Sequence, residues 1–136
     1  MTAMTLTCPD AVETVLPGAP RSVSEARALV RSELGASTLT EAAVLAMSEL
    51  ATNAIAYSRS GLPGGTFGVT VQCVTDGVVI RVRDGGARTA PKLADPEPGT
   101  EHGRGLLIIA ALAADWGTEA VAVGRVTWCR IERDRA

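Results

Sequence analysis

The sequence predicts an α+β fold in which helices pack on one face of a mainly antiparallel sheet. Two helical segments come first along the chain, and the rest reads as strands with one helix inserted, an order typical of this fold class. Hydrophobic residues make up 46% of the chain but aromatic residues only 3%, so the core must be built from Val, Leu, Ile and Ala. Trp116 and Trp128 are expected to pack in the core or at the sheet edge.

Two segments in the first half of the chain are predicted to be helices. Each begins with a capping box, in which a Ser or Thr is followed three residues later by a Glu: Ser22 with Glu25, and Thr38 with Glu41. Gly35 is expected to end the first helix, and the second should continue to about Tyr57. An edge strand is expected before both helices, over residues 11–16.

The strands are predicted from the alternation of apolar residues with small or polar ones. This pattern gives a strand from Phe67 to Cys73 and a partner strand from Val78 to Val82, joined by a two-residue hairpin turn. Two closing strands, DWGTEAV and RVTWCRI, are expected to meet around a turn at Gly124.

The chain is expected to form a single domain over residues 1–136, because no repeat or interdomain linker divides it. The first ten residues are expected to be flexible. Residues 85–102 are rich in proline and glycine and have no periodicity. A connection of this length inside a compact domain is usually functional, so we interpret it as a lid. A short apolar helix, GLLIIAALAA, is predicted after it.

Composition argues against several classes of protein. A net charge of −2 and the absence of a Lys/Arg run argue against direct binding to nucleic acid or to an anionic membrane. No long apolar run and no signal-peptide pattern is present, so we expect a cytoplasmic protein. The three widely spaced cysteines include no CxxC motif, which argues against a disulfide framework or a zinc site. Cys73 and Cys129 are expected to be buried.

The segment SELATNAIAYS in the second helix holds Glu49 and Asn53, four residues apart. On a helix these two lie about 40° apart, and Ser48 and Thr52 extend them into one polar stripe. Such a stripe can be an ordinary solvated face. Alternatively, a carboxylate beside a carboxamide offers a general base next to an oxygen ligand suited to Mg²⁺. The helix carries few charges, which weakens the first interpretation.

Asp84 ends a predicted strand and is followed directly by Gly85 and Gly86. A carboxylate at this point can accept a hydrogen bond from an exocyclic amine, and glycine allows close approach of a flat ring. The alternative is a plain Asp-Gly-Gly turn, for which this tripeptide is well suited.

The segment HGRGLL contains Gly103 and Gly105 on either side of Arg104, where a helix is predicted to begin. Free backbone amides and the positive end of the helix dipole can bind an anion at such a point. The segment lacks the lysine of a Walker A loop and the spacing of a dinucleotide fingerprint. A flexible helix start is the alternative. His102, the single histidine, has no partner for a metal site and is expected to contact the lid.

Taken in order, these features resemble the Bergerat ATP-binding fold of the GHKL superfamily, which includes gyrase and the histidine kinases. The order is E-x-x-x-N on a helix, a strand ending in D-x-G, a loop, G-x-G-L opening a helix, and a Thr on the last strand. The segments SELATNAIAYSRSGLPGGTF, GRGLLIIAALAADWG and GRVTW are most similar to small actinobacterial ATP-binding regulators akin to anti-sigma-factor serine kinases. The resemblance implies a two-layer sandwich with a mixed sheet.

The resemblance also implies a role for each motif residue. Glu49 would polarise the attacking hydroxyl or water, and Asn53 would bind Mg²⁺. Asp84 would bond the adenine amino group of ATP, Gly86 would let the base lie close, and Thr127 would complete the adenine pocket. Four residues would receive the phosphates: Gly103, Arg104, Gly105 and Leu106. Phosphoryl transfer chiefly needs positioning and charge neutralisation, which this set could provide.

The implied function is that of a regulator of anti-sigma-factor type. It would bind ATP with Mg²⁺, sequester a sigma factor, and act as a serine/threonine kinase on a STAS-type antagonist protein. Related kinases commonly dimerise, so a homodimer is among the expected assemblies. Two alternatives are a non-catalytic module in which ATP only shapes a partner-docking surface, and an interaction domain that binds no nucleotide.

Three positions depart from the pattern of these relatives. Ala56 and Tyr57 occupy positions where the helix motif typically continues with Arg-His. Arg88 occupies the second glycine position of the D-x-G-x-G motif. The change at Ala56 and Tyr57 leaves the positions of the metal ligand and of the general base in place but alters the neighbouring pocket. The arginine at position 88 is expected to alter the hinging of the lid and the affinity for nucleotide.

Overall fold

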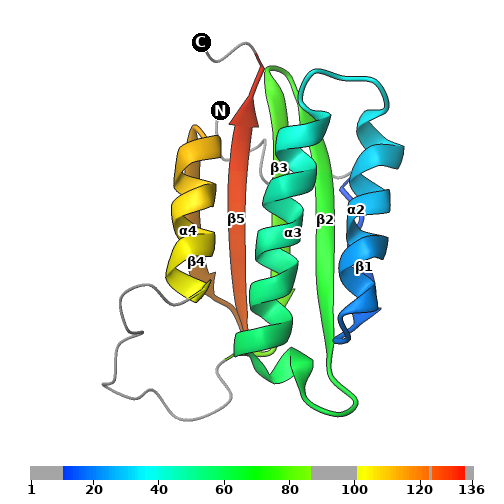
Figure 1. Ribbon diagram of the computed structural model, residues 1–136, viewed down its shortest axis with the longest axis vertical. Coiled ribbons are helices and arrows are strands. Elements are labelled where there is room, and N and C mark those ends of the chain that lie inside the picture. The colour runs from blue at the N-terminus through cyan, green and yellow to red at the C-terminus, as the bar shows by residue number, and fades with distance from the viewer. Residues whose placement is uncertain (1–10, 87–100, 123, 134–136) are drawn as a thin grey trace.

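The computed structural model describes residues 11–86, 101–122 and 124–133, and for residues 101–105 it describes the backbone alone. The elements follow one another in this order: β1 (Thr14–Pro17), α2 (Arg21–Leu34), α3 (Thr40–Tyr57), the 3-10 turn η1 (Arg59–Gly61), β2 (Thr66–Val74), β3 (Gly77–Asp84), α4 (Glu101–Leu112), β4 (Asp115–Ala120) and β5 (Arg125–Glu132). In this part of the chain, α2, α3 and α4 all lie on one face of the sheet (Figure 1). The α+β prediction is therefore confirmed.

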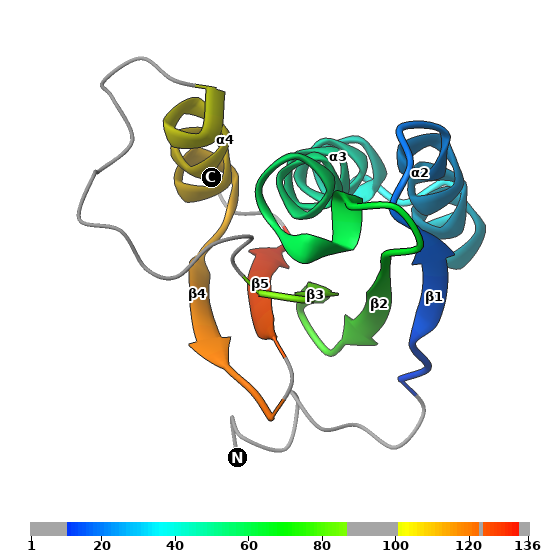
Figure 2. The same cartoon turned by 90° about the horizontal axis from the view of Figure 1, so that it is seen from below.

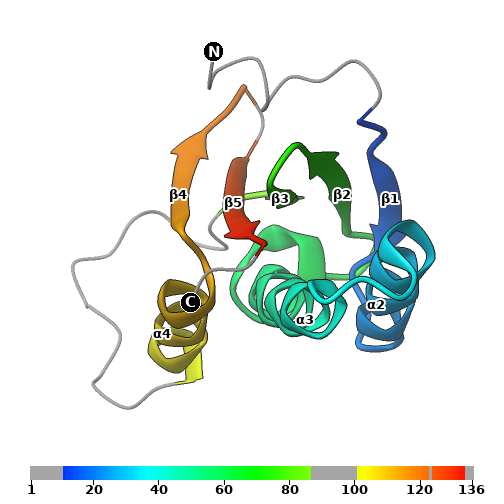
Figure 3. The same ribbon diagram turned by 90° about the horizontal axis from the view of Figure 1, so that it is seen from above.

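The five strands form one sheet in the order β1-β2-β3-β5-β4, which sets β3 at its centre. All of the described pairings are antiparallel, so no mixed pairing occurs among these strands. The register sets Val82 of β3 between Val69 of β2 and Thr127 of β5. Seen from either end, the helices form one layer and the strands the other (Figures 2 and 3).

The core lies between the two layers and is made mainly of small aliphatic side chains, as the composition predicts. Alternate residues of the central strands point into it, including Val78, Ile80 and Val82, which are at most 2% exposed. The helix α3 contributes alanines and Met47, and β2 contributes Phe67, a fully buried aromatic residue. Each strand thus presents one face to the helices, as period-two alternation requires.

The first capping-box prediction is wrong. The helix α2 begins at Arg21, and Pro20 precedes it with helical torsion angles (φ −53°, ψ −34°) and no capping side chain. Proline is already restricted to a φ near this value, so the helical path starts earlier than a Ser22 cap would allow. Ser22 consequently lies within the first turn, where its buried hydroxyl has no hydrogen-bond partner among the described residues.

The second capping-box prediction is also wrong, because α3 begins after Leu39 and not after Thr38. Leu39 precedes α3 in a helical conformation and no side chain caps it. The Leu39 amide donates to Ser37 Oγ at 3.0 Å, and Thr40 Oγ1 donates to the Gly35 carbonyl oxygen at 2.9 Å. The predicted end of α2 at Gly35 is confirmed, and this glycine has a φ of 59°.

The two described cysteines differ from each other. Cys129 is fully buried as predicted, and burial raises the pKa of its thiol to about 12. A thiol with such a pKa is unreactive at neutral pH. Cys73 is exposed, contrary to the prediction, because it lies beside the hairpin end of β2.

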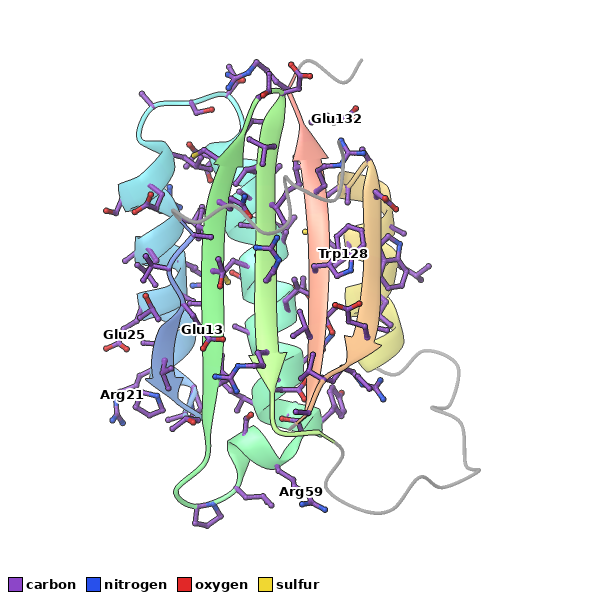
Figure 4. The ribbon with its side chains drawn as sticks, turned by 180° about the vertical axis from the view of Figure 1, so that it is seen from behind. Glu13, Arg21, Glu25, Arg59, Trp128 and Glu132 are labelled. Atoms are coloured by element: carbon purple, nitrogen blue, oxygen red, sulfur yellow. The ribbon has the colours of Figure 1, made fainter. Side chains whose placement is uncertain are left out.

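The face of the sheet opposite the helices is shown in Figure 4, with Trp128 of β5 on it. Arg83 forms an ion pair with Glu13 at 2.8 Å, and the Arg81 guanidinium donates to Gln72 Oε1 at 2.9 Å. Trp128 packs close to Gly117 of β4, so its expected packing role is confirmed. Within the described ranges, no helix has the length and apolar character needed to span a membrane.

Candidate functional site

Four segments that are distant in sequence end or begin at the same end of the molecule. They are the last turn of α3 with η1, the end of β3, the first turn of α4, and the start of β5 (Figure 1). The antiparallel pairing of β3 with β5 brings Asp84 opposite Arg125 at this end. The sequence motifs on these segments are therefore gathered by the fold.

A cavity of about 270 Å³ opens at this end of the structure. Five of the nine residues predicted for a nucleotide site line it: Asn53, Asp84, Gly86, Leu106 and Thr127. Apolar and polar side chains complete its wall: Leu50, Ala54, Tyr57, Ser58, Val82, Trp116, Thr118 and Arg125. A cavity with an apolar wall and a few convergent polar groups is typical of a small-molecule site.

Of the other four predicted residues, Glu49 is the one whose side chain the structure describes, and it is not among the described residues that line the cavity. Glu49 lies one turn before Asn53 on α3 and is half-buried. Gly103, Arg104 and Gly105 lie in the first turns of α4, and their side-chain positions are outside the described structure. The helix starts at Glu101, earlier than predicted, so the end of the proposed lid is helical. Residues 87–100, with Arg88, fall outside the described ranges.

The early start of α4 changes the predicted phosphate cradle. Only the amides of the first turn of a helix lack partners within it. Gly103 belongs to that turn, whereas Leu106 lies beyond it. Leu106, which is half-buried, lines the cavity.

The polar stripe predicted on α3 is divided by the fold. Ser48 is buried and its hydroxyl accepts a hydrogen bond from Arg27 Nε at 2.6 Å, while Thr52 is exposed. Asn53 is intermediate in exposure between Ser48 and Thr52, and it lines the cavity. A simple solvated face is therefore wrong for Ser48 and for Asn53, because one is used in packing α2 and the other in the cavity wall.

Asp84 is held in a defined orientation at the end of β3. The Gly86 amide donates to Asp84 Oδ1 at 2.7 Å, and Gly86 has a φ of 88°, which glycine adopts readily. Burial raises the pKa of the Asp84 carboxyl, and the Gly86 hydrogen bond and the charge of Arg125 oppose that rise. The Asp-Gly-Gly segment is thus a turn, but one whose carboxylate lines the cavity.

The turn after Asp84 is tied to the segment that follows α3. The Gly85 amide donates to Ser60 Oγ at 2.9 Å, and the Arg59 amide donates to the Gly86 carbonyl oxygen at 2.8 Å. These two bonds join the strand side of the cavity to its helix side.

Thr127 has a neighbour that the sequence motifs did not indicate. Its hydroxyl donates to Thr118 Oγ1 on β4 at 3.4 Å, a long and weak hydrogen bond. The two threonines are opposite each other in the β4–β5 register, and both line the cavity. They add hydroxyl groups that a polar ligand can use as donors or acceptors.

The wall includes three larger residues that were not among the nine predicted for the nucleotide site. Tyr57 and Trp116 are 43% and 36% exposed, and Arg125 is also exposed. Tyr57 is four residues after Asn53 on α3, and its place in the wall agrees with the expectation that this position alters the pocket. Trp116 alternates with Thr118 on the cavity face of β4 and is a wall residue as well as an edge residue. Arg125 becomes a neighbour of Asp84 only through the strand register.

The donor set of the cavity suits ATP better than a metal ion held by protein alone. No group of three or more His, Cys, Asp or Glu side chains in the described structure could hold a metal. Mg²⁺ commonly takes one or two protein oxygens and completes its shell with substrate phosphates and water. The Asn53 side chain can supply such an oxygen, and the Asp84 carboxylate can accept from an amine.

The family model of the histidine kinase-like ATPase domain matches residues 16–131, most of the chain. The chain therefore belongs to this family, which is part of the GHKL superfamily with the Bergerat fold. Membership in the family implies ATP as the bound nucleotide. A search of curated proteins gave no match.

Replacement of Gly124 by alanine should destabilise the β3–β5 contact beside Asp84. A Cβ at Gly124 would overlap the Asp84 carbonyl oxygen, and the residue has a φ of 100°. Gly64→Ala is the matched control, because Gly64 has a φ of 79° but no atom near its absent Cβ. We expect Gly124→Ala to lower the free energy of unfolding by at least ~1 kcal/mol more than the control, measured in urea. Equal losses would contradict the close contact.

Replacement of Asp84 by asparagine should slightly stabilise the free protein at neutral pH. Because burial raises the Asp84 pKa, ionisation at neutral pH costs stability, and protonation at lower pH removes that cost. We expect a gain below about 1 kcal/mol, since the group is half-buried. The gain should disappear as the pH falls through the raised pKa, above the ordinary value of 3.8.

Urea unfolding at a series of pH values measures this difference. Asp115→Asn, at an exposed carboxylate on β4, is the control and should change stability little at neutral pH. A destabilised Asp84→Asn protein at pH 7 would contradict the sign of the effect.

Proposed function

We propose that this chain is an ATP-binding regulator of anti-sigma-factor type. In this proposal it binds ATP with Mg²⁺, sequesters a sigma factor, and phosphorylates a serine or threonine of a STAS-type antagonist in the cytoplasm. The single observation that supports it most is that Asn53, Asp84 and Thr127 line one cavity in a domain of this ATPase family.

The proposed roles follow from the chemistry of each group. The Asp84 carboxylate accepts a hydrogen bond from the amine of adenine, and Gly86 leaves room for the ring. The carboxamide oxygen of Asn53 would hold Mg²⁺, which would supply positive charge to neutralise the phosphates. Thr127 and Thr118 supply hydroxyl groups beside the base.

The first turn of α4 and the segment after it are proposed to receive the phosphates. Amides at a helix start and the positive end of its dipole favour anions, which supports Gly103 and Arg104 in this role. Gly105, the next residue, is proposed to let the phosphates approach closely, because it has no side chain. Leu106 closes the apolar wall beside them. Glu49 is proposed to take the proton of the attacking hydroxyl, because a carboxylate one turn from Asn53 can reach an acceptor bound near the phosphates.

A second function is a non-catalytic module, in which ATP only shapes a docking surface. The position of Glu49 favours it, because this carboxylate is not among the residues that line the cavity. The replacement of a typical Arg-His pair by Ala56 and Tyr57 also changes the wall next to Asn53. The binding of ATP and the transfer of its phosphoryl group must therefore be tested separately.

Saturating ATP with Mg²⁺ should raise the melting temperature of the protein. A ligand at 100 times its dissociation constant adds about 2.7 kcal/mol to the free energy of unfolding. We expect Asn53→Ala to lose the Mg²⁺-dependent part of the shift and to keep the part seen with ATP and EDTA. Thr52→Ala, at the exposed neighbouring position, is the control and should keep both parts. Unchanged Mg²⁺ dependence in Asn53→Ala would refute the metal role.

Glu49→Gln should strongly reduce phosphoryl transfer from ATP to the antagonist, while ATP binding persists. The assay is incubation of γ-labelled ATP and Mg²⁺ with the candidate antagonist, and we expect transfer to fall by roughly 10²- to 10⁴-fold. Glu41→Gln is the matched control, at an exposed glutamate two turns earlier on α3. Undiminished transfer in Glu49→Gln would refute its role as base, and binding without transfer in the wild type would favour the module.

A further inference from the structure

The hydroxyl group of Ser60 occupies a buried junction between the two sides of the cavity. Ser60 is 2% exposed and lies in η1, directly after α3. Its Oγ accepts a hydrogen bond from the Gly85 amide at 2.9 Å. Ser60 does not line the cavity, so any effect it has on a ligand must be transmitted through the residues that it contacts.

The position of Ser60 is fixed by the chain around it. The Ser60 amide donates to Ser58 Oγ at 3.0 Å, and Ser58 Oγ donates to the Ala54 carbonyl oxygen at 2.6 Å. Gly18 and Gly65 lie so close that a Cβ on either would overlap the Ser60 carbonyl oxygen. The segment is therefore tied to the last turn of α3 on one side and to the start of β2 on the other.

From Ser60 the contacts lead directly to the carboxylate of Asp84. Ser60 Oγ holds the Gly85 amide, and the adjacent Arg59 amide holds the Gly86 carbonyl oxygen at 2.8 Å. The amide of the same Gly86 donates to Asp84 Oδ1 at 2.7 Å. Two glycines in succession have many accessible backbone conformations, so a short turn of this kind needs external bonds to keep one of them.

We propose that Ser60 is a positioning residue of the nucleotide site, whose hydroxyl orients the Asp84 carboxylate toward the amine of the base. This inference rests on the proposed function, in which Asp84 recognises adenine. Loss of the hydroxyl leaves the partly buried Gly85 amide without its acceptor, and the Asp84–Gly86 turn then adopts other conformations. The amine of the base loses a fixed acceptor, while contacts to the rest of the nucleotide remain.

The test compares ATP with purine riboside triphosphate, which differs from ATP only in lacking the 6-amino group. The ratio of the two dissociation constants, measured by calorimetry, reports the amine contact alone. We expect Ser60→Ala to reduce the preference for ATP by about tenfold, toward the value for Asp84→Asn. Ser60→Cys, which keeps a side-chain atom at this position but accepts hydrogen bonds weakly, should reduce it as well, so the result does not depend on the folding of one variant.

A double variant of Ser60 and Asp84, together with a matched control, distinguishes an effect on the orientation of Asp84 from a general loss of stability. In the Asp84→Asn background, Ser60→Ala should change the ratio less than about twofold, because both changes act on one contact. Ser37→Ala removes a serine that accepts the Leu39 amide at 3.0 Å at the far end of α3, and it should leave the ratio unchanged. Thermal unfolding of each variant shows whether a loss of stability alone alters the ratio.

Three results would overturn the inference. Ser60→Ala and Ser60→Cys proteins that keep the wild-type preference for ATP would refute the role of Ser60 and leave the proposed function intact. Independent, multiplicative effects in the double variant would show that Ser60 does not act through Asp84. A wild-type protein that binds both nucleotides equally, or neither, would refute the recognition of adenine by Asp84, and the role of Ser60 with it.

Discussion

The close packing of α3 on the sheet is the constraint on which the site depends. Ala43, Ala46, Ala51 and Ala54 are at most 2% exposed, so small side chains fill this interface. Small residues let a helix backbone approach its neighbour closely, and interiors of this density leave little empty space. The cavity exists where this packing ends, beyond Ala54, with the polar end of the helix facing the ends of β3 and β5. A larger residue at position 54 would reduce the cavity, because Ala54 is part of its wall.

The polar groups of the site work against the stability that this packing provides. The half-buried Asp84 carboxyl has its pKa raised by desolvation, which means that the folded protein holds the ionised group at a cost. The Gly86 amide and the charge of Arg125 offset part of this cost. Perturbed groups of this kind cluster at functional sites. The place of Asp84 in the cavity wall, together with this cost, supports its proposed role in recognising adenine.

Sequence patterns predicted those features that depend on local periodicity. The β2–β3 hairpin, the end of α2 at Gly35 and the length of α3 are confirmed, because alternation and glycine conformation act over a few residues. The helix starts could not be predicted from Ser22 and Thr38, since the direction in which the chain enters each helix decides which hydroxyl caps it. Asn53, Asp84 and Thr127 were found by motif order, whereas Arg125 and Ser60 depend on tertiary register.

The departure from the relatives at Tyr57 has a physical consequence for the proposed ligand. The chain is poor in aromatic residues, yet Tyr57 and Trp116 both lie at the cavity wall and are partly exposed there. Aromatic faces can pack against a planar base, but an uncharged ring cannot neutralise phosphate. An Arg-His pair at this place would add positive charge. In this chain, we propose that the negative charge of the phosphates is neutralised by Mg²⁺, by the start of α4 and by Arg125. Arg125 is the basic side chain among the described wall residues. Tyr57 and Trp116 are thus suited to packing against the base, and the proposed neutralisation of the phosphates depends on groups other than these two rings.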